Sequence, residues 1–213
     1  MKSLTEYINE GLKLGKGSRY KYYPETKEEL KHIIEERIKE EGYECDLNDI
    51  CTSKITDMSK LFGGGGFGQK GVGHNFNGDI SKWDVSKVTN MREMFAHSNF
   101  NGDLSKWNVS NVTDMNNMFS FAKFTGENGN IDKWDVSNVT NMCEMFWHSN
   151  FNSDISKWDV SNVTDMENMF KYSKIDCDLS EWKLNKNCKS VFLFSDSALA
   201  NNPEKWPQGY KGI

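Results

Sequence analysis

The sequence predicts an α/β solenoid, a chain that winds into about six stacked coils, each made of a short strand and a short helix. The first observation is tryptophan, which recurs every 24 residues with one interval of 27: Trp83, Trp107, Trp134, Trp158, Trp182 and Trp206. The second is the segment from Phe76 to Phe95, which is repeated almost unchanged from Phe100, Phe124 and Phe151. A fixed period of this length is typical of solenoids, in which each unit buries its apolar face only against its neighbours.

The chain divides into three parts. Residues 1–42 do not repeat and are expected to form a helical leader and cap. Within them Thr26 is a suitable N-cap, Glu29 completes a capping box, and Gly42 ends a helix over Lys27 to Glu41 that carries one apolar stripe. Residues 43–198 are expected to form the solenoid, with a glycine-rich insertion at 63–75, and residues 199–213 a C-terminal cap.

Each repeat carries two apolar patterns. The spacing of Ile80, Trp83 and Val85 predicts a short strand whose apolar side chains point inward. After the strand we expect a short helix with inward residues at i, i+3 and i+4, namely Met91, Met94 and Phe95. Tryptophan then fills the core position that leucine usually occupies.

The residues beside each tryptophan are expected to point away from the core and to form columns on a concave face. The column before tryptophan is mostly lysine, the column after it mostly aspartate, and the next one mostly serine. We predict that this face and the glycine-rich insertion bind a partner, through Lys82, Asp84, Lys106, Asn108, Lys133, Asp135, Lys157, Asp159, Phe67 and Lys70. The alternative is a solvated face whose opposite charges hold the coils in register.

The repeated segment F-N-x-D-I-S-x-W-D-V-S-x-V-T-x-M-x-x-M-F resembles the BspA-like leucine-rich repeats of bacterial surface proteins and lipoproteins, over roughly residues 43–198. The resemblance implies a leucine-rich-repeat-type solenoid without catalytic activity, whose relatives bind host proteins or mediate adhesion. The first residues, M-K-S-L-T-E-Y-I-N-E, look like the short amphipathic leaders of some bacteriophage proteins, which agrees with a phage origin.

Composition excludes several classes of function. A net charge of −5 argues against a general nucleic-acid binder, which needs a basic face. No apolar run is suited to a signal peptide or a membrane span, so we expect a cytoplasmic protein. The five cysteines are scattered without a C-x-x-C pair or a Cys/His cluster, which favours reduced thiols and no metal site. No catalytic constellation stands out from the repeats, so no enzyme, cofactor or small-molecule substrate is expected.

Three features of the sequence could indicate either a ligand site or an ordinary surface or turn role. The glycine-rich insertion lacks the G-K-[ST] of a phosphate-binding loop and is interpreted as a surface loop. The run from Asn77 to Asp79 and its equivalents lack the extra carboxylates of a calcium site and are interpreted as turns and ladders between coils. His97 and His148 share a repeat position two coils apart, about 10 Å by the strand spacing, and are interpreted as surface residues.

The function expected from these features is non-enzymatic protein–protein interaction through the lysine, aspartate and serine columns and the projecting loops. Two alternatives stay open. One is a phage virion component or a phage-encoded inhibitor of a host defence protein. The other is a bacterial surface adhesin whose export signal lies outside this sequence.

Overall fold

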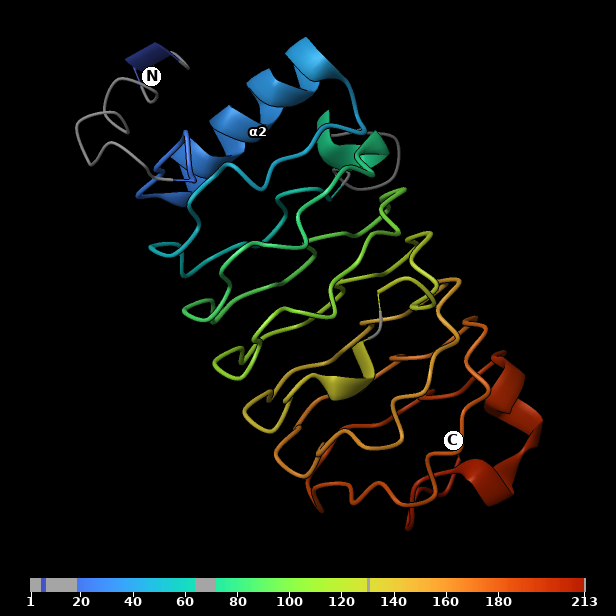
Figure 1. The fold of residues 1–213 in the computed structure, drawn as a ribbon. Coiled ribbons are helices and arrows are strands. Elements are labelled where there is room, and N and C mark those ends of the chain that lie inside the picture. The colour runs from blue at the N-terminus through green and yellow to red at the C-terminus, as the bar shows by residue number, and fades with distance from the viewer. Residues whose placement is uncertain (1–4, 7–18, 64–71, 130, 213) are drawn as a thin grey trace.

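The computed structural model describes residues 5–6, 19–63, 72–129 and 131–212. In these residues the chain winds as successive coils that lie one above another (Figure 1). Helix α2 (Lys27–Glu41) lies at the N-terminal end, and the 3-10 helices η3 (Ala198–Asn201) and η4 (Pro203–Lys205) lie at the C-terminal end. Two further 3-10 helices, η1 (Val72–Asn75) and η2 (Ile131–Lys133), interrupt the coils.

Helix α2 begins and ends at the residues that the sequence predicts. The Thr26 hydroxyl accepts the N–H of Glu29 at 3.2 Å, while the Glu29 carboxylate accepts the N–H of Glu25, rather than that of Thr26, at 2.8 Å. Gly42 ends the helix with a φ of 89°, a conformation that glycine adopts without steric cost. The helix buries the predicted stripe together with one arginine: Leu30, Ile33, Ile34, Arg37 and Ile38.

Arg37 fastens α2 to the first coil. Its guanidinium donates to the Asp49 carboxylate at 2.8 Å and to the backbone carbonyl of Asp46 at 2.9 Å. The Arg37 side chain is almost fully buried, so both the ion pair and the carbonyl contact satisfy a charge that would otherwise be costly to desolvate.

The predicted strands do not form. In the described part of the chain, parallel pairing between repeats consists of isolated bridges, which join Asp57, Asn90, Asp114, Asn141, Asp165 and Lys189 in series. The segment around Trp83, predicted as a strand, lies between two turns. Asp79 accepts the N–H of Ser81 at 2.9 Å, and Asp84 accepts the N–H of Ser86 at 3.0 Å. Such Asx turns compete with extended backbone, which is why the chain bends before a strand can extend.

The short helix predicted around Met91 is a run of tight turns. The N–H of Met94 donates to the carbonyl of Met91 at 3.1 Å within the coil. The N–H groups of Met91 and Glu93 leave the coil and donate to the carbonyls of Asp114 and Asn116 in the next one, both at 2.9 Å. A helix would direct these groups along its own axis, so hydrogen bonding between coils replaces the helix.

Along this segment, N–H groups that bond within the coil alternate with N–H groups that bond to the next coil. The alternation places eleven described non-glycine residues in the left-handed region, with φ between 54° and 61°. They occupy two repeat positions: Lys60, Glu93, Asn117, Glu144, Asn168 and Phe192 at the first, and His97, Phe121, His148, Tyr172 and Asp196 at the second. Left-handed backbone costs a residue with a side chain roughly 1–2 kcal/mol. The hydrogen bonds between coils offset this cost; Glu144, for example, donates to the carbonyl of Glu167 at 2.9 Å.

Columns of aromatic rings fill the interior. One column stacks with centroid separations of 5.4–5.8 Å and comprises Phe62, Phe95, Phe119, Phe146, Phe170 and Phe194. The five repeat tryptophans Trp83, Trp107, Trp134, Trp158 and Trp182 are at most 4% exposed, which confirms their predicted burial. Their indole N–H groups donate to carbonyls of the preceding coil, as Trp134 does to Leu104 at 3.1 Å. Trp206 departs from this pattern, because it is only partly buried and donates to Leu199 within its own cap at 2.8 Å.

Phe119 tests the role of the stacked rings in stability. Phe119→Ala removes a fully buried ring and leaves a cavity between two neighbours in the column, so we expect the free energy of unfolding to fall by about 3–5 kcal/mol. Urea unfolding followed by tryptophan fluorescence measures it. Lys133→Ala is the surface control and is expected to leave the midpoint unchanged; an equal loss in both variants would contradict the packing account.

Glu144 distinguishes the observed turns from the helix that the sequence predicts. Because its φ is 57°, Glu144→Gly is expected to be about 1 kcal/mol more stable than Glu144→Ala. In a helix the order is reversed, since glycine is about 1 kcal/mol worse than alanine there. Comparing the two urea midpoints decides between these conformations, and an alanine variant more stable than the glycine variant would disprove the left-handed assignment.

Candidate binding surfaces

The predicted lysine column lies on the surface of the stack. Lys82, Lys106, Lys133 and Lys157 are exposed. Within the described residues, none of these four ammonium groups forms an ion pair within 4.0 Å of a carboxylate. Direct pairing with the neighbouring aspartates therefore does not hold these lysines in place.

The column after tryptophan is also exposed, and its oxygen atoms close turns: Asp84, Asn108, Asp135 and Asp159. Asp84 accepts both the hydroxyl of Ser86 at 2.6 Å and its N–H at 3.0 Å. Hydrogen bonds from the serines hold the pKa values of Asp84 and Asp159 below the ordinary value. The aspartate and serine columns thus shape the backbone, and the lysines remain the groups free to meet a partner.

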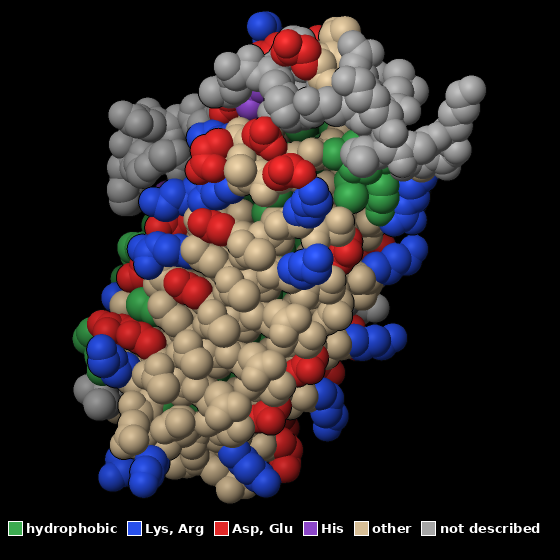
Figure 2. All heavy atoms as spheres, turned by 90° about the vertical axis from the view of Figure 1, so that its left-hand side faces the viewer, with side chains coloured by type: hydrophobic (Ala, Val, Ile, Leu, Met, Phe, Trp, Pro, Cys, Tyr) green, Lys and Arg blue, Asp and Glu red, His purple; other side chains and the backbone are tan. Residues whose placement is uncertain are grey.

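The sides of the stack differ in chemistry. Figure 2 shows one side whose middle consists mostly of neutral polar side chains and backbone, with cationic and acidic side chains along both margins. Near the end of the predicted lysine column, a shallow depression of about 440 Å³ is lined by residues that include Lys157, Asp159, Glu181 and Lys183. The other two predicted partner-binding residues, Phe67 and Lys70, lie outside the described residues.

A column of stacked aromatic rings runs along the surface. His97, Phe121, His148 and Tyr172 occupy one repeat position in four successive coils, and neighbouring ring centroids lie 4.6, 4.9 and 4.5 Å apart. Tyr172 is 43% exposed, His148 is exposed, and the other two rings are half-buried. We call these four side chains the aromatic ladder. Since each face is covered by the next ring, the ladder presents ring edges to solvent.

From the sequence, the two histidines of this ladder are interpreted as surface residues that share a repeat position, without Phe121 and Tyr172. The structure places Phe121 between them, so that they belong to one stack. The signal was present, because Phe121 and Tyr172 fall at the same repeat position as the histidines. This repeat position lies after the apolar residues of the short helix that the sequence predicts. The predicted helix therefore assigns it no structural role.

Further side chains widen the ladder into a patch. The Trp147 ring packs against Phe121 at 4.8 Å and an interplanar angle of 69°. Lys171 places its ammonium 5.5 Å from the ring centre of Tyr172 and 4.9 Å from that of Phe192, which is 43% exposed. The patch therefore combines the edges of aromatic rings with the ammonium group of Lys171.

The Asn-Gly-Asp runs act as turns and ladders, as predicted. Asp79 closes its turn on Ser81. Asn77 accepts the N–H of Asn101 in the next coil at 2.8 Å, and Asn101 accepts the N–H of Thr125 at 3.0 Å. These side-chain oxygens accept hydrogen bonds from backbone N–H groups, which supports the interpretation that they are structural.

Three of the five thiols are poor nucleophiles. Burial raises the pKa of Cys143 to about 12 and those of Cys177 and Cys188 to about 11, so these thiols stay protonated at neutral pH. Across the described ranges, no group of three or more His, Cys, Asp or Glu side chains is arranged to hold a metal ion. No helix in those ranges is long and apolar enough to cross a bilayer.

Two overlapping stretches of the chain, residues 31–127 and 120–208, match a family described as Mycoplasma protein of unknown function, DUF285. The chain belongs to this family. The DUF285 family is associated with BspA-like repeat proteins, and the two matches together begin within α2 and cover all the coils described above. No curated protein and no solved structure matches the chain.

His97 gives the aromatic ladder a pH dependence. Partial burial, with the charge of His74 added, lowers the pKa of His97. The unfolded chain keeps the ordinary value of about 6.5, so it binds the proton first as the pH falls. We therefore expect the free energy of unfolding to decrease between about pH 7.5 and about pH 5.5. Urea unfolding across that range measures it; His97→Phe keeps a ring in the stack, and an unchanged pH dependence in this variant would rule out His97 as the cause.

Proposed function

We propose that the protein is a non-enzymatic protein–protein interaction module, a solenoid of the BspA-like leucine-rich-repeat type in which tight turns replace the usual strands. The aromatic ladder carries this proposal, because it is a continuous column of aromatic rings that reaches the surface of the coils. Extended apolar patches on soluble proteins mark interaction sites, and aromatic residues dominate the energetics of protein interfaces.

The ladder is arranged before any partner arrives. Its rings already stack on one another, so binding immobilises few additional rotamers and loses little side-chain entropy. Bulky residues such as Phe121 and Tyr172 occupy left-handed backbone, at φ of 55° and 58°, where glycine or asparagine is favoured. The same position is left-handed in five successive described coils, so the proposal rests on the aromatic side chains found there and not on the backbone conformation.

The lysine column is proposed as a second contact. Lys106, Lys133 and Lys157 are exposed on neighbouring coils and carry positive charge without an ion-pair partner in the described chain. Such a row accelerates association with an acidic surface and favours one orientation of the partner. The ladder then supplies most of the binding energy, and the lysines supply steering.

The ladder variant Phe121→Asn with Tyr172→Asn tests this function. Asparagine tolerates left-handed backbone, so the fold is retained while both rings are lost. We expect affinity for a partner, first isolated by capture from the native cell and then purified, to fall at least about tenfold, or about 1.4 kcal/mol. Calorimetric titration measures it.

Two comparisons sharpen this test. Tyr43→Asn removes an equally exposed tyrosine outside the ladder and is expected to leave affinity unchanged. The triple variant Lys106→Glu, Lys133→Glu, Lys157→Glu is expected to slow association and weaken its dependence on salt. Full affinity in the ladder variant would exclude the ladder as the binding surface.

A further inference from the structure

The hydrogen-bond ladder between coils is open at its C-terminal end. In the preceding coil, the N–H groups of Met166, Asn168, Phe170 and Tyr172 donate to the next coil at 2.7–3.0 Å. The equivalent donors of the last coil are the N–H groups of Ser190, Phe192, Phe194 and Asp196. Within residues 131–212, no carbonyl or side chain accepts from any of these four. An unpaired row of backbone donors is a template for another chain.

The C-terminal segment covers this row only in part. It forms one parallel bridge to the last coil, Lys183 with Gln208, which Gly209 follows with a φ of 84°. The rings of Trp206 and Tyr210 pack on Phe194, with centroid separations of 5.9 and 5.3 Å. The row is therefore shielded at Phe194 and left accessible toward Ser190.

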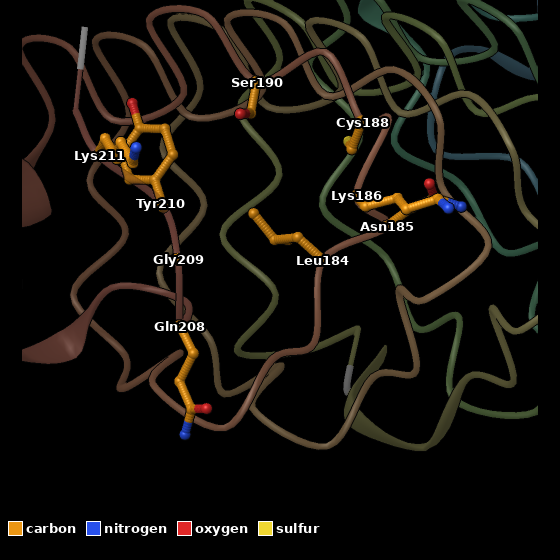
Figure 3. A pocket seen from close by; sticks show the side chains of 9 residues that line it. All are labelled: Leu184, Asn185, Lys186, Cys188, Ser190, Gln208, Gly209, Tyr210 and Lys211. Carbon is orange, nitrogen blue, oxygen red and sulfur yellow. The ribbon is translucent and has the colours of Figure 1, made fainter.

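A hollow of about 370 Å³ lies between the last coil and this segment (Figure 3). Leu184, Cys188 and Ser190 line it from the coil, and Tyr210 lines it from the opposite side. It is partly apolar, and its polar wall includes the coil segment that carries the unpaired Ser190 N–H. An extended backbone with one apolar side chain fits this combination.

The hollow is also cationic. Lys186 and Lys211 line it, and both are exposed without an ion-pair partner among the described residues. Lys189 belongs to the same coil segment and meets Asp165 only at 3.9 Å. In a chain with a net charge of −5, this concentration of lysine at one end selects for an acidic ligand.

We propose that the C-terminal end of the stack binds an extended acidic peptide segment of a protein partner. The segment lies parallel to the last coil, and its carbonyls at alternate positions accept from Ser190 and Phe192, as the last coil accepts from Met166 and Asn168. Its carboxylates meet Lys186 and Lys211, and one apolar side chain enters the hollow over Leu184. This site does not use the aromatic ladder and stands independently of it.

A second copy of the chain does not fit this site. Its own N-terminal end, where carbonyls would accept, is covered by α2 and by the bridge of Tyr22 to Ile50 (Figure 1). Its C-terminal end carries the same lysines, so two such ends repel each other. The lysines thus oppose self-association while favouring an acidic chain.

A labelled peptide of about eight residues that alternates glutamate with valine, long enough to span the row, tests the proposal against one that alternates lysine with valine. We expect only the acidic peptide to raise fluorescence anisotropy with the full-length protein, and its binding to slow amide hydrogen exchange at Ser190 and Phe192. The double variant Lys186→Glu with Lys211→Glu is expected to lower its affinity at least about tenfold.

The matched control is Lys31→Glu with Lys39→Glu, which makes the same change in net charge on exposed residues of α2 at the opposite end. It is expected to bind the acidic peptide as the wild type does. Ser190→Tyr, which fills the hollow, is expected to block binding without changing charge. Equal binding of both peptides, protection confined to other coils, or self-association that occupies this end without peptide would each overturn the proposal.

Discussion

The backbone hydrogen bonds between coils are the constraint on which the rest of this structure depends. At each junction the donors stand at alternate residues; Met142, Glu144, Phe146 and His148 donate in this way to the following coil. Because only every second N–H leaves the coil, the residues between must close turns within it, and this forces left-handed backbone at two positions. The length of this segment therefore cannot change without breaking the register. Both insertions accordingly fall in the connectors that follow it, at residues 63–75 and around 127–129.

The same register converts each sequence position into a column. Inward positions give the stacked phenylalanines and the tryptophans whose indoles donate to the coil before. Outward positions form surface columns in which similar side chains recur once in every coil. Most left-handed positions carry polar residues. Some of these, such as asparagine, tolerate the conformation, and the others are polar enough to face solvent at little further cost in free energy. Aromatic rings at Phe121 and Tyr172 are not required by the left-handed backbone, and their stacking at the surface is the feature on which the proposed binding role rests.

Sequence reasoning succeeded where local rules decide the structure. Helix α2 is bounded by Thr26 and Gly42 as predicted, because a cap and a glycine act through neighbouring backbone alone. It failed where pairing between coils competes with local preference. Met91, Met94 and Phe95 have the spacing of a helical face, yet two successive turns with left-handed residues bring the same side chains inward. The aspartates beside tryptophan fit an alternating strand in the sequence, but in the structure their side chains close turns. Only the hydrogen-bond pattern of the whole stack distinguishes these outcomes.

A stack joined in this way has a direction, and its two ends are chemically different. In the segment that includes Met142 and His148 each coil donates to the one that follows, whereas at the threonine positions it accepts from the one that follows, as Thr164 accepts from Lys189 at 2.9 Å. Within the described residues, the last coil therefore presents unpaired N–H groups in the first of these segments, at Ser190, Phe192, Phe194 and Asp196. The N-terminal end is covered by α2, whose Arg37 and Lys27 bring cations to the first coils at Asp49 and Asp57. Among residues 131–212, the C-terminal end is closed where Gln208 bridges to Lys183 and where Trp206 and Tyr210 pack on Phe194. Its lysines add positive charge to a row of partially positive N–H groups, so both features favour the same electron-rich ligand. The unpaired N–H groups and the lysines at this end are together the basis of the proposal that it binds an acidic chain.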